Sequence, residues 1–101
     1  MDVAFENRRL HRLCASAQEL RRALGARGER RLRAHIKSLL AAESLEEFRS
    51  LPGRCCELPG GRYALELGKG KRLTFRCTAS DDGVVWAAVR SIVLIDIEEQ
   101  G

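Results

Sequence analysis

Arginine is the residue type in this chain that is best suited to chemistry on a charged partner. Of its 18 basic residues, 15 are arginine and three are lysine. A guanidinium fork matches the geometry of a phosphate, whereas the lysine ammonium acts as a point charge. The excess indicates a polyanionic partner, although a genome of high GC content, which replaces lysine by arginine everywhere, explains it equally well.

The positive charge is concentrated in the first part of the chain. Residues 1–42 hold ten Lys/Arg and four Asp/Glu, a net charge of +6, whereas residues 43–101 hold eight and ten, a net charge of −2. Six arginines cluster along a predicted helical stretch: Arg21, Arg22, Arg27, Arg30, Arg31 and Arg33. They either contact RNA phosphates or form the solvated side of an amphipathic helix, and the charge excess favours RNA.

A second group of cations falls on predicted strands and turns. Arg72 alternates with apolar residues, so it takes a polar-facing strand position, where it either holds a phosphate by a bidentate contact or is simply exposed. Arg54 and Arg62 flank the same predicted face. Lys69 and Lys71 stand at a predicted hairpin tip, where solubility alone would also explain them.

The four cysteines do not form a metal or disulfide pattern. They are Cys14, Cys55, Cys56 and Cys77, and no pair has the C-x-x-C spacing of a zinc site. Adjacent residues on a strand face opposite ways, so Cys55 and Cys56 cannot easily share one ion. We expect Cys14, Cys55 and Cys77 to be small buried hydrophobic residues, with no metal and no cofactor.

The first half of the chain reads as helical after a short strand at 3–5. Asn7 is a candidate N-cap, and apolar residues then follow helical spacing from Leu10 to Leu24. Gly25 and Gly28 end this helix in a turn, and a second helix runs from about 29 to 42. The pair is expected to form an antiparallel hairpin. Ser44 with Glu47 predicts the capping box of a short helical turn, which Pro52-Gly53 ends.

The second half changes to a period of two. Strands are expected at 54–58, at 63–67 and at 72–77, with turns at 59–61, at 68–71 and at 81–83. From 84 to 97 nearly every residue is apolar or β-branched, which predicts a long strand buried on both faces, with a bulge near Ser91. The fold class is therefore α+β: an N-terminal strand and a helical hairpin packed on a small antiparallel sheet, in one domain.

Neither a membrane span nor a signal peptide is indicated. The longest apolar runs are far shorter than the ~20 residues that cross a bilayer, and acidic Asp2 and Glu6 stand where a signal peptide needs a basic start. We therefore expect a cytoplasmic protein with no membrane partner.

Several segments, in this order, resemble the RelE/ParE superfamily of toxins from bacterial type II toxin–antitoxin systems, in particular the HigB-like killer-protein branch. The matching segments are Phe5–Leu10, Leu40–Glu47, Leu51–Leu58, Tyr63–Leu67, Arg72–Phe75 and Val93–Glu98. The family commonly reads Leu-Pro-Gly-x-Arg/Cys-His-Glu-Leu in the third segment and Arg-Leu-x-Phe in the fifth. The resemblance implies a single RelE/HigB-like toxin domain over residues 1–101.

The same resemblance implies a toxin that binds the ribosome, cuts mRNA and is inhibited by a cognate antitoxin encoded by an adjacent gene. In such cleavage a ribose 2′-OH attacks the adjacent phosphate, which requires a base, an acid and cations. This chain departs from the family where that chemistry sits. Cys56 replaces the usual His, and Glu99-Gln100-Gly101 replaces a terminal Asp-Tyr-His.

The resemblance assigns candidate roles residue by residue. The catalytic candidates are Arg72, Arg62, Cys56 and Glu99, and the RNA-binding candidates are Arg54, Lys69, Lys71, Arg30, Arg31 and Arg33. Cys56 is either activated by neighbouring arginines or an inert thiol at a former His position. Glu99 either accepts a proton or belongs to a solvated tail together with Glu98.

Three functions remain open from the sequence. One is a ribosome-dependent mRNA endonuclease with weakened catalysis, which the arginines favour. Another is a non-enzymatic RelE/ParE-fold protein, either a gyrase-inhibiting ParE-like toxin or a decayed toxin that still binds its antitoxin, which the absent His and Tyr favour. The last is a plain nucleic-acid-binding module. We give preference to the endoribonuclease.

Overall fold

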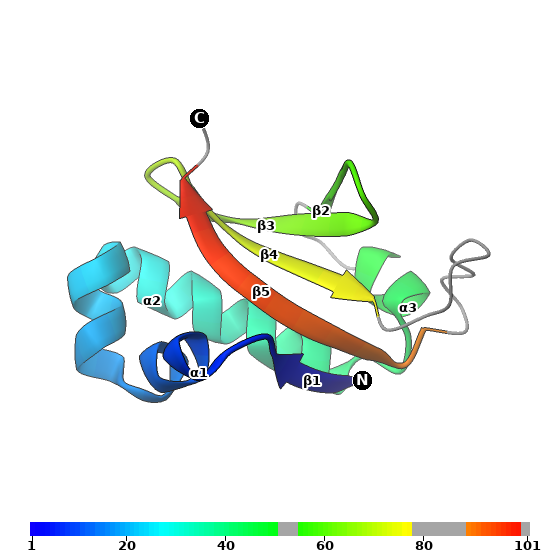
Figure 1. Ribbon diagram of the computed structural model, residues 1–101, viewed down its shortest axis with the longest axis horizontal. Helices are drawn as coiled ribbons and strands as arrows, with labels where there is room; N and C mark the ends of the chain where they lie inside the picture. The colour runs from blue at the N-terminus through cyan, green and yellow to red at the C-terminus, as the bar shows by residue number, and fades with distance from the viewer. Residues whose placement is uncertain (51–54, 78–88, 100–101) are drawn as a thin grey trace.

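Five strands and three helices make up the described part of the chain, which a computed structural model covers at residues 1–50, 55–77 and 89–99 (Figure 1). They are β1 (Asp2–Phe5), α1 (Arg8–Ala15), α2 (Ala17–Ala41), α3 (Leu45–Ser50), β2 (Cys55–Leu58), β3 (Arg62–Gly68), β4 (Lys71–Cys77) and β5 (Ser91–Glu99). The fold is α+β, as predicted. Arg54, the helix stop at 52–53 and the turn at 81–83 lie outside the described residues.

The strands form a single sheet in the order β1-β5-β4-β3-β2. The predicted meander is present, because β2 to β5 pair antiparallel with their neighbours. The prediction of an antiparallel sheet is nevertheless wrong at one edge, since β1 pairs parallel with β5, from Asp2 opposite Ser91 to Phe5 opposite Leu94. Parallel neighbours need a long crossover, and here nearly the whole chain runs between the two strands.

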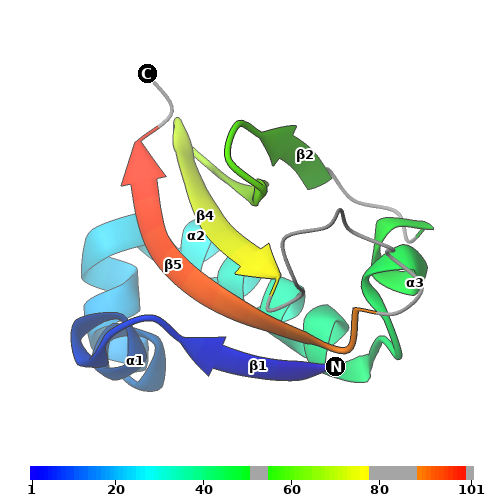
Figure 2. The ribbon, with the colours of Figure 1, turned by 45° about the vertical axis from the view of Figure 1, so that its right-hand side comes forward.

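The hydrophobic core lies between the sheet and α2, which crosses behind one sheet face (Figure 2). Alternate strand positions point toward the helix, and their buried residues are Tyr63, Leu65, Leu67, Leu73, Phe75, Ile92 and Leu94. The helical residues Leu20, Leu24, Leu32 and Leu39 meet them. Phe75 is fully buried, and its ring stacks on Tyr63 at 5.3 Å and meets Phe48 edge-on at 6.4 Å. The period of two thus identified the core face of β3 and β4.

The helical layer differs from the predicted hairpin of two helices. The first predicted helix breaks at Ser16, which has extended backbone angles and caps α2 by accepting a hydrogen bond from the Glu19 N–H at 3.2 Å. A second break follows at Gly25, with φ 75° and ψ 173°, a conformation that is essentially restricted to glycine. Gly28, predicted to form part of the turn, lies inside α2, where a Cβ would stand 2.6 Å from that of Leu24.

Strand β5 starts later than predicted, and its bulge lies elsewhere. Of the predicted strand, residues 84–88 lie outside the described residues, and Val89 and Arg90 precede β5, which begins at Ser91. The register against β4 shifts between Thr74 opposite Asp96 and Phe75 opposite Leu94, so Ile95 is the extra residue. The prediction of a bulge near Ser91 is therefore wrong by four positions along the strand.

The caps and the hairpin turn agree with the sequence. Asn7 accepts a hydrogen bond from the Leu10 N–H at 2.9 Å, and Ser44 accepts one from the Glu47 N–H at 3.3 Å. In the β3–β4 turn, both Lys69 (φ 53°) and Gly70 (φ 73°) have positive φ, as a type I′ turn requires. Among the described residues, no helix has the length and apolar character needed to cross a membrane.

Candidate active site

We call the sheet face opposite α2 the open face. Because side chains alternate along a strand, the positions between the core residues point to it. Charged residues from three neighbouring strands share the open face: Arg62 and Glu66 on β3, Arg72 and Arg76 on β4, and Asp96 and Glu98 on β5. The two signs are balanced in this group, so what distinguishes its members is how each one is paired.

The bulge at Ile95 determines which β5 residues reach the open face. Leu94 points to the core, and strict alternation from it would also turn Asp96 and Glu98 inward. Because the bulge absorbs one residue, Ile97 packs against the core instead, and Glu98 lies opposite Arg72. The Asp96 carboxylate accepts a hydrogen bond from the Ile97 N–H at 2.8 Å, and the Thr74 hydroxyl donates to the Asp96 carbonyl at 3.1 Å.

Arg72 stands on the middle strand of the sheet, with Glu66 opposite on one side and Glu98 on the other. Opposite charges at such cross-strand positions usually pair. Within the described ranges, however, the Arg72 side chain makes no hydrogen bond or ion pair, and its Nε is buried without an acceptor. An unsatisfied buried donor costs about 1–3 kcal/mol. The Arg72 Nε therefore has hydrogen-bonding capacity that the described residues do not use.

Glu98 is the residue of this face that sequence reasoning missed, because it was placed in a solvated tail. Its side chain is 34% exposed, and its Oε2 is buried without a hydrogen-bond donor. The Arg62 Nη1 lies 3.8 Å from this oxygen, within range for an ion pair but too far for a hydrogen bond. No local signal in the sequence distinguished Glu98 from Glu99, because the bulge at Ile95 decides which of them faces Arg72.

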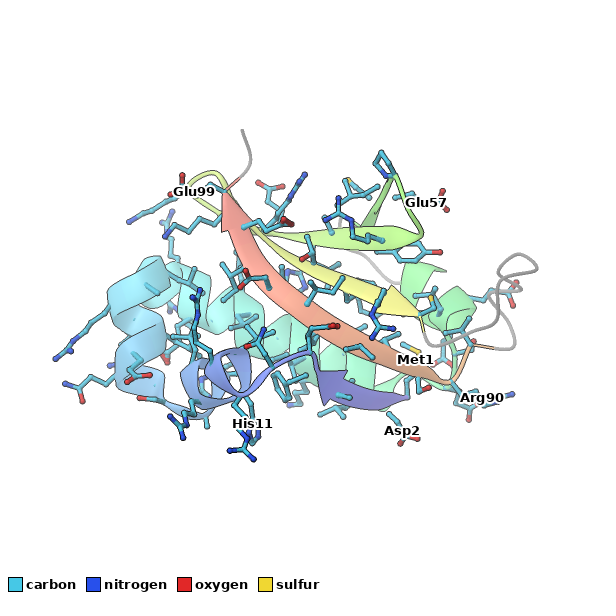
Figure 3. The ribbon with its side chains drawn as sticks, viewed as in Figure 1. Met1, Asp2, His11, Glu57, Arg90 and Glu99 are labelled. Carbon is cyan, nitrogen blue, oxygen red and sulfur yellow. The ribbon has the colours of Figure 1, made fainter. Side chains whose placement is uncertain are left out.

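The other catalytic candidates are placed differently. Cys56 is exposed on edge strand β2 opposite Ala64, and so lies on the open face. Glu99, which is labelled in Figure 3, lies opposite Lys71 at the end of β5 and points to the sheet face opposite that of Glu98. The structure therefore brings Arg62 and Arg72 together with Glu98 and leaves Glu99 outside the group.

The two lysines of the hairpin tip have separate environments. The Lys71 ammonium donates a hydrogen bond to the Ala23 carbonyl at 2.8 Å, just before the break in α2 at Gly25. A cation at the end of a helical segment satisfies a carbonyl that has no partner within that segment. Lys69 is exposed, and its ammonium lies beside Gly25 at the same break, without a hydrogen bond or ion pair to any described residue. Lys71 thus has a structural contact, and Lys69 remains available to a partner.

The arginines of α2 also differ in what their side chains contact. Glu29 is buried, and its carboxylate forms ion pairs with the Nε of Arg21 at 2.8 Å and the Nε of Arg33 at 3.5 Å. Arg30 and Arg31 are exposed, and the Arg31 guanidinium lies beside Gly68 of β3. Of the three predicted RNA-binding residues on α2, Arg33 is therefore engaged with a buried carboxylate, whereas Arg30 and Arg31 face solvent.

A cavity of about 370 Å³ opens on the helical side, between α1, α2 and the end of β1. Its walls include Phe5, Cys14, Ile36 and Leu40, and Leu40 is 55% exposed. Burial raises the pKa of the Cys14 thiol, although nearby Arg33 opposes the shift. The pKa of Cys77 is likewise raised by burial, against a hydrogen bond with Tyr63. Cys14 and Cys77 are partly buried rather than fully buried as predicted, and both pack against the core; the side chain of Cys55 lies outside the described part of the chain.

Within residues 1–50, 55–77 and 89–99, no group of three or more His, Cys, Asp or Glu side chains is arranged to hold a metal ion. Comparisons of the chain with protein-family models, with curated proteins and with solved structures find no match.

Proposed function

We propose that the chain is a ribosome-dependent mRNA endonuclease, the toxin of a type II toxin–antitoxin system, with a RelE-like fold of the HigB branch. The observation that carries this proposal is the unpartnered guanidinium of Arg72 at the middle of the open face. A guanidinium that makes no hydrogen bond or ion pair with the described residues is suited to hold a phosphodiester and to stabilise the charge that develops on it. Arg62 adds a second guanidinium from the neighbouring strand.

The reaction is attack by a ribose 2′-oxygen on the adjacent phosphorus, with departure of the 5′-oxygen. Arg72 binds the phosphate and orients it, and Arg62 helps to balance the growing negative charge. Cys56 on the same face is a poor general acid compared with imidazole, and Gln100-Gly101 supply no Tyr or His. Because a positioned general acid contributes about 10²–10⁴-fold, cleavage without one is slow, and the arginines supply the stabilisation of the phosphate charge.

The partners follow from the same proposal. Exposed Arg30, Arg31 and Lys69 contact phosphates of ribosomal RNA or mRNA, so binding weakens steeply as salt rises. A cognate antitoxin encoded by an adjacent gene covers the open face, with Arg62 and Arg72 beneath it. The reaction takes place on the ribosome in the cytoplasm and needs no cofactor.

A second candidate function is a non-enzymatic RelE/ParE-fold protein that binds its antitoxin or DNA gyrase. The observation in its favour is that several candidate cations already contact oxygens of the chain itself. Arg33 pairs with Glu29, Lys71 bonds the Ala23 carbonyl, and Arg62 faces Glu98. Such contacts reduce the charge that is free for RNA, while leaving a rigid surface for a protein.

Induced expression in a bacterial host separates the two functions. The endonuclease arrests growth and produces cleavage sites on translated mRNA, mapped by primer extension, and co-expression of the neighbouring gene suppresses both effects. Growth arrest with intact mRNA would favour the gyrase-binding function. Neither effect, with a tight complex between the two proteins, would identify a decayed toxin.

A further inference from the structure

Arg72 and Glu98 form an unusual pair for the surface of a sheet. They are direct cross-strand neighbours of opposite charge on β4 and β5, yet no nitrogen of Arg72 comes within ion-pair distance of Glu98. Each also keeps one buried polar atom without a hydrogen bond, a donor in Arg72 and an acceptor in Glu98. One small group that offers both an acceptor and a donor would satisfy both residues.

We propose that Glu98 is the general base of the cleavage reaction and that Arg72 and Glu98 together read a ribonucleotide through its 2′-OH and its 3′-phosphate; this rests on the proposed function. The 2′-OH donates to the Glu98 carboxylate, and the neighbouring phosphate accepts from Arg72. Both side chains are long and partly exposed, so rotation about their outer torsions brings these atoms to the substrate on the fast timescale of surface side chains.

The step balances as a transesterification. The 2′-OH proton passes to the Glu98 carboxylate while the 2′-oxygen forms a bond to phosphorus. The bond from phosphorus to the 5′-oxygen breaks, and that oxygen takes a proton from water. Glu98 then returns its proton to solvent, which leaves a 2′,3′-cyclic phosphate and a free 5′-hydroxyl. No oxidant, reductant or metal enters the step.

The charged groups that face Glu98 support this role. Arg72 comes from β4 and Arg62 from β3, while Asp96 follows the same face of β5 and binds its own strand through the Ile97 N–H. Arg62 stays at 3.8 Å from Oε2, which orients the carboxylate without occupying it with a hydrogen bond. Glu99, the acidic neighbour in sequence, points to the other face.

A binding experiment tests the site without requiring turnover. The probes are adenosine 3′-monophosphate and 2′-deoxyadenosine 3′-monophosphate, titrated into the full chain and followed by NMR chemical shifts. We expect the ribonucleotide to bind about tenfold more tightly, the value of one charge-assisted hydrogen bond. Glu98→Ala removes this preference, whereas Glu46→Ala, an exposed acidic residue on α3, retains it.

A kinetic experiment tests the base role. In single-turnover cleavage of mRNA on translating ribosomes, Glu98→Gln lowers the rate by about 10²-fold or more and removes the acid limb of the pH–rate profile. Glu98→Asp keeps that limb at a reduced rate, and Glu46→Gln retains the wild-type profile. Far-UV circular dichroism and thermal unfolding check that each variant is folded.

The outcomes separate this inference from the proposed function. Cleavage by the wild type that Glu98→Gln leaves unchanged, or that only Glu99→Gln abolishes, overturns the base role and leaves the endonuclease standing. A ribose preference lost in Glu98→Ala, in a protein that never cleaves mRNA, overturns the endonuclease and supports the ribonucleotide site. Equal binding of the two probes, together with unchanged kinetics in Glu98→Gln, overturns the inference entirely.

Discussion

The cations of the helical layer and those of the open face differ in what their charges contact. On the helical side, Arg33 pairs with the buried Glu29, and Lys71 of the hairpin bonds the Ala23 carbonyl. On the open face, Arg76 pairs with Glu6 at 3.3 Å, but Arg72 pairs with nothing among the described residues. Charge and exposure alone therefore do not identify a binding residue. An unused hydrogen-bonding group in a position that is otherwise well packed is the more selective sign.

This difference has a consequence for stability. A cation that satisfies the chain's own oxygens stabilises the fold when it is present, whereas an unpartnered buried donor costs stability that only a ligand repays. Arg72 is therefore expected to serve function at a cost in stability, whereas Arg33 stabilises the fold. Substitutions at the two positions should show this reversal.

The largest expected effect is on activity at Arg72. Arg72→Ala should reduce mRNA cleavage by about 10²–10³-fold, the usual loss when one donor to a transition state is removed. The free energy of unfolding should stay the same or rise by up to about 1 kcal/mol, because the Arg72 side chain makes no hydrogen bond or ion pair with the described residues. Primer extension on translated mRNA and urea denaturation measure the two effects.

The control is Arg12→Ala, which removes an exposed arginine of α1. It should leave cleavage unchanged. A clear loss of stability in Arg72→Ala, in proportion to its loss of activity, would contradict this prediction. Arg72 would then be a cation that stabilises the fold, like Arg33.

At Arg33 the effect should fall on stability instead. Arg33→Glu removes a partner from the buried Glu29 and brings a second carboxylate next to it. Because Arg33 is about half exposed, solvent screens part of this repulsion, and we expect a loss of about 1–2 kcal/mol in urea denaturation. Arg30→Glu, one residue after Glu29 and exposed, should change stability by less than about 0.5 kcal/mol. Equal losses in the two variants would contradict the pairing.

Local signals in the sequence predicted much of the frame that carries these residues. Asn7 and Ser44 cap helices as predicted, and Lys69-Gly70 form the predicted hairpin turn. The alternation in β3 and β4 identified the core face correctly. That alternation also placed Arg62 and Arg72 on a common face. One available signal was overlooked: Ser16 with Glu19 repeats the spacing of Ser44 with Glu47, and it marks the break between α1 and α2.

The rest depended on long-range pairing. Residues 92–95 are apolar without interruption, so no period distinguishes a bulge at Ile95 from one at Ser91. Only the pairing with β4 shows which side Glu98 takes, and therefore that it, rather than Glu99, meets Arg72. The parallel addition of β1 to β5 is likewise a contact between the two ends of the chain, which local pattern does not encode.

A smaller effect is expected at the hairpin tip. Lys71→Met removes the hydrogen bond to the Ala23 carbonyl and the favourable charge at the end of that helical segment, so we expect a loss of about 0.5–1 kcal/mol in thermal or urea denaturation. Lys69→Met, on the same turn and with the same unbranched stem, should be close to neutral. If both substitutions cost the same, the contact at Ala23 contributes nothing specific.

The smallest expected effect is on the salt dependence of RNA binding. Each phosphate contact adds about 0.7–0.9 to the slope of log affinity against log salt concentration. Arg30 is exposed, so Arg30→Gln should lower the slope for ribosome binding by about one contact and weaken affinity only a few-fold. Arg33→Gln should lower the slope less, because the pair with Glu29 already uses part of its charge. Filter binding across a salt series compares the two variants at equal protein stability. Identical slopes would mean that the buried carboxylate does not divert Arg33 from RNA, and the arginines of α2 would then act as one uniform charged surface.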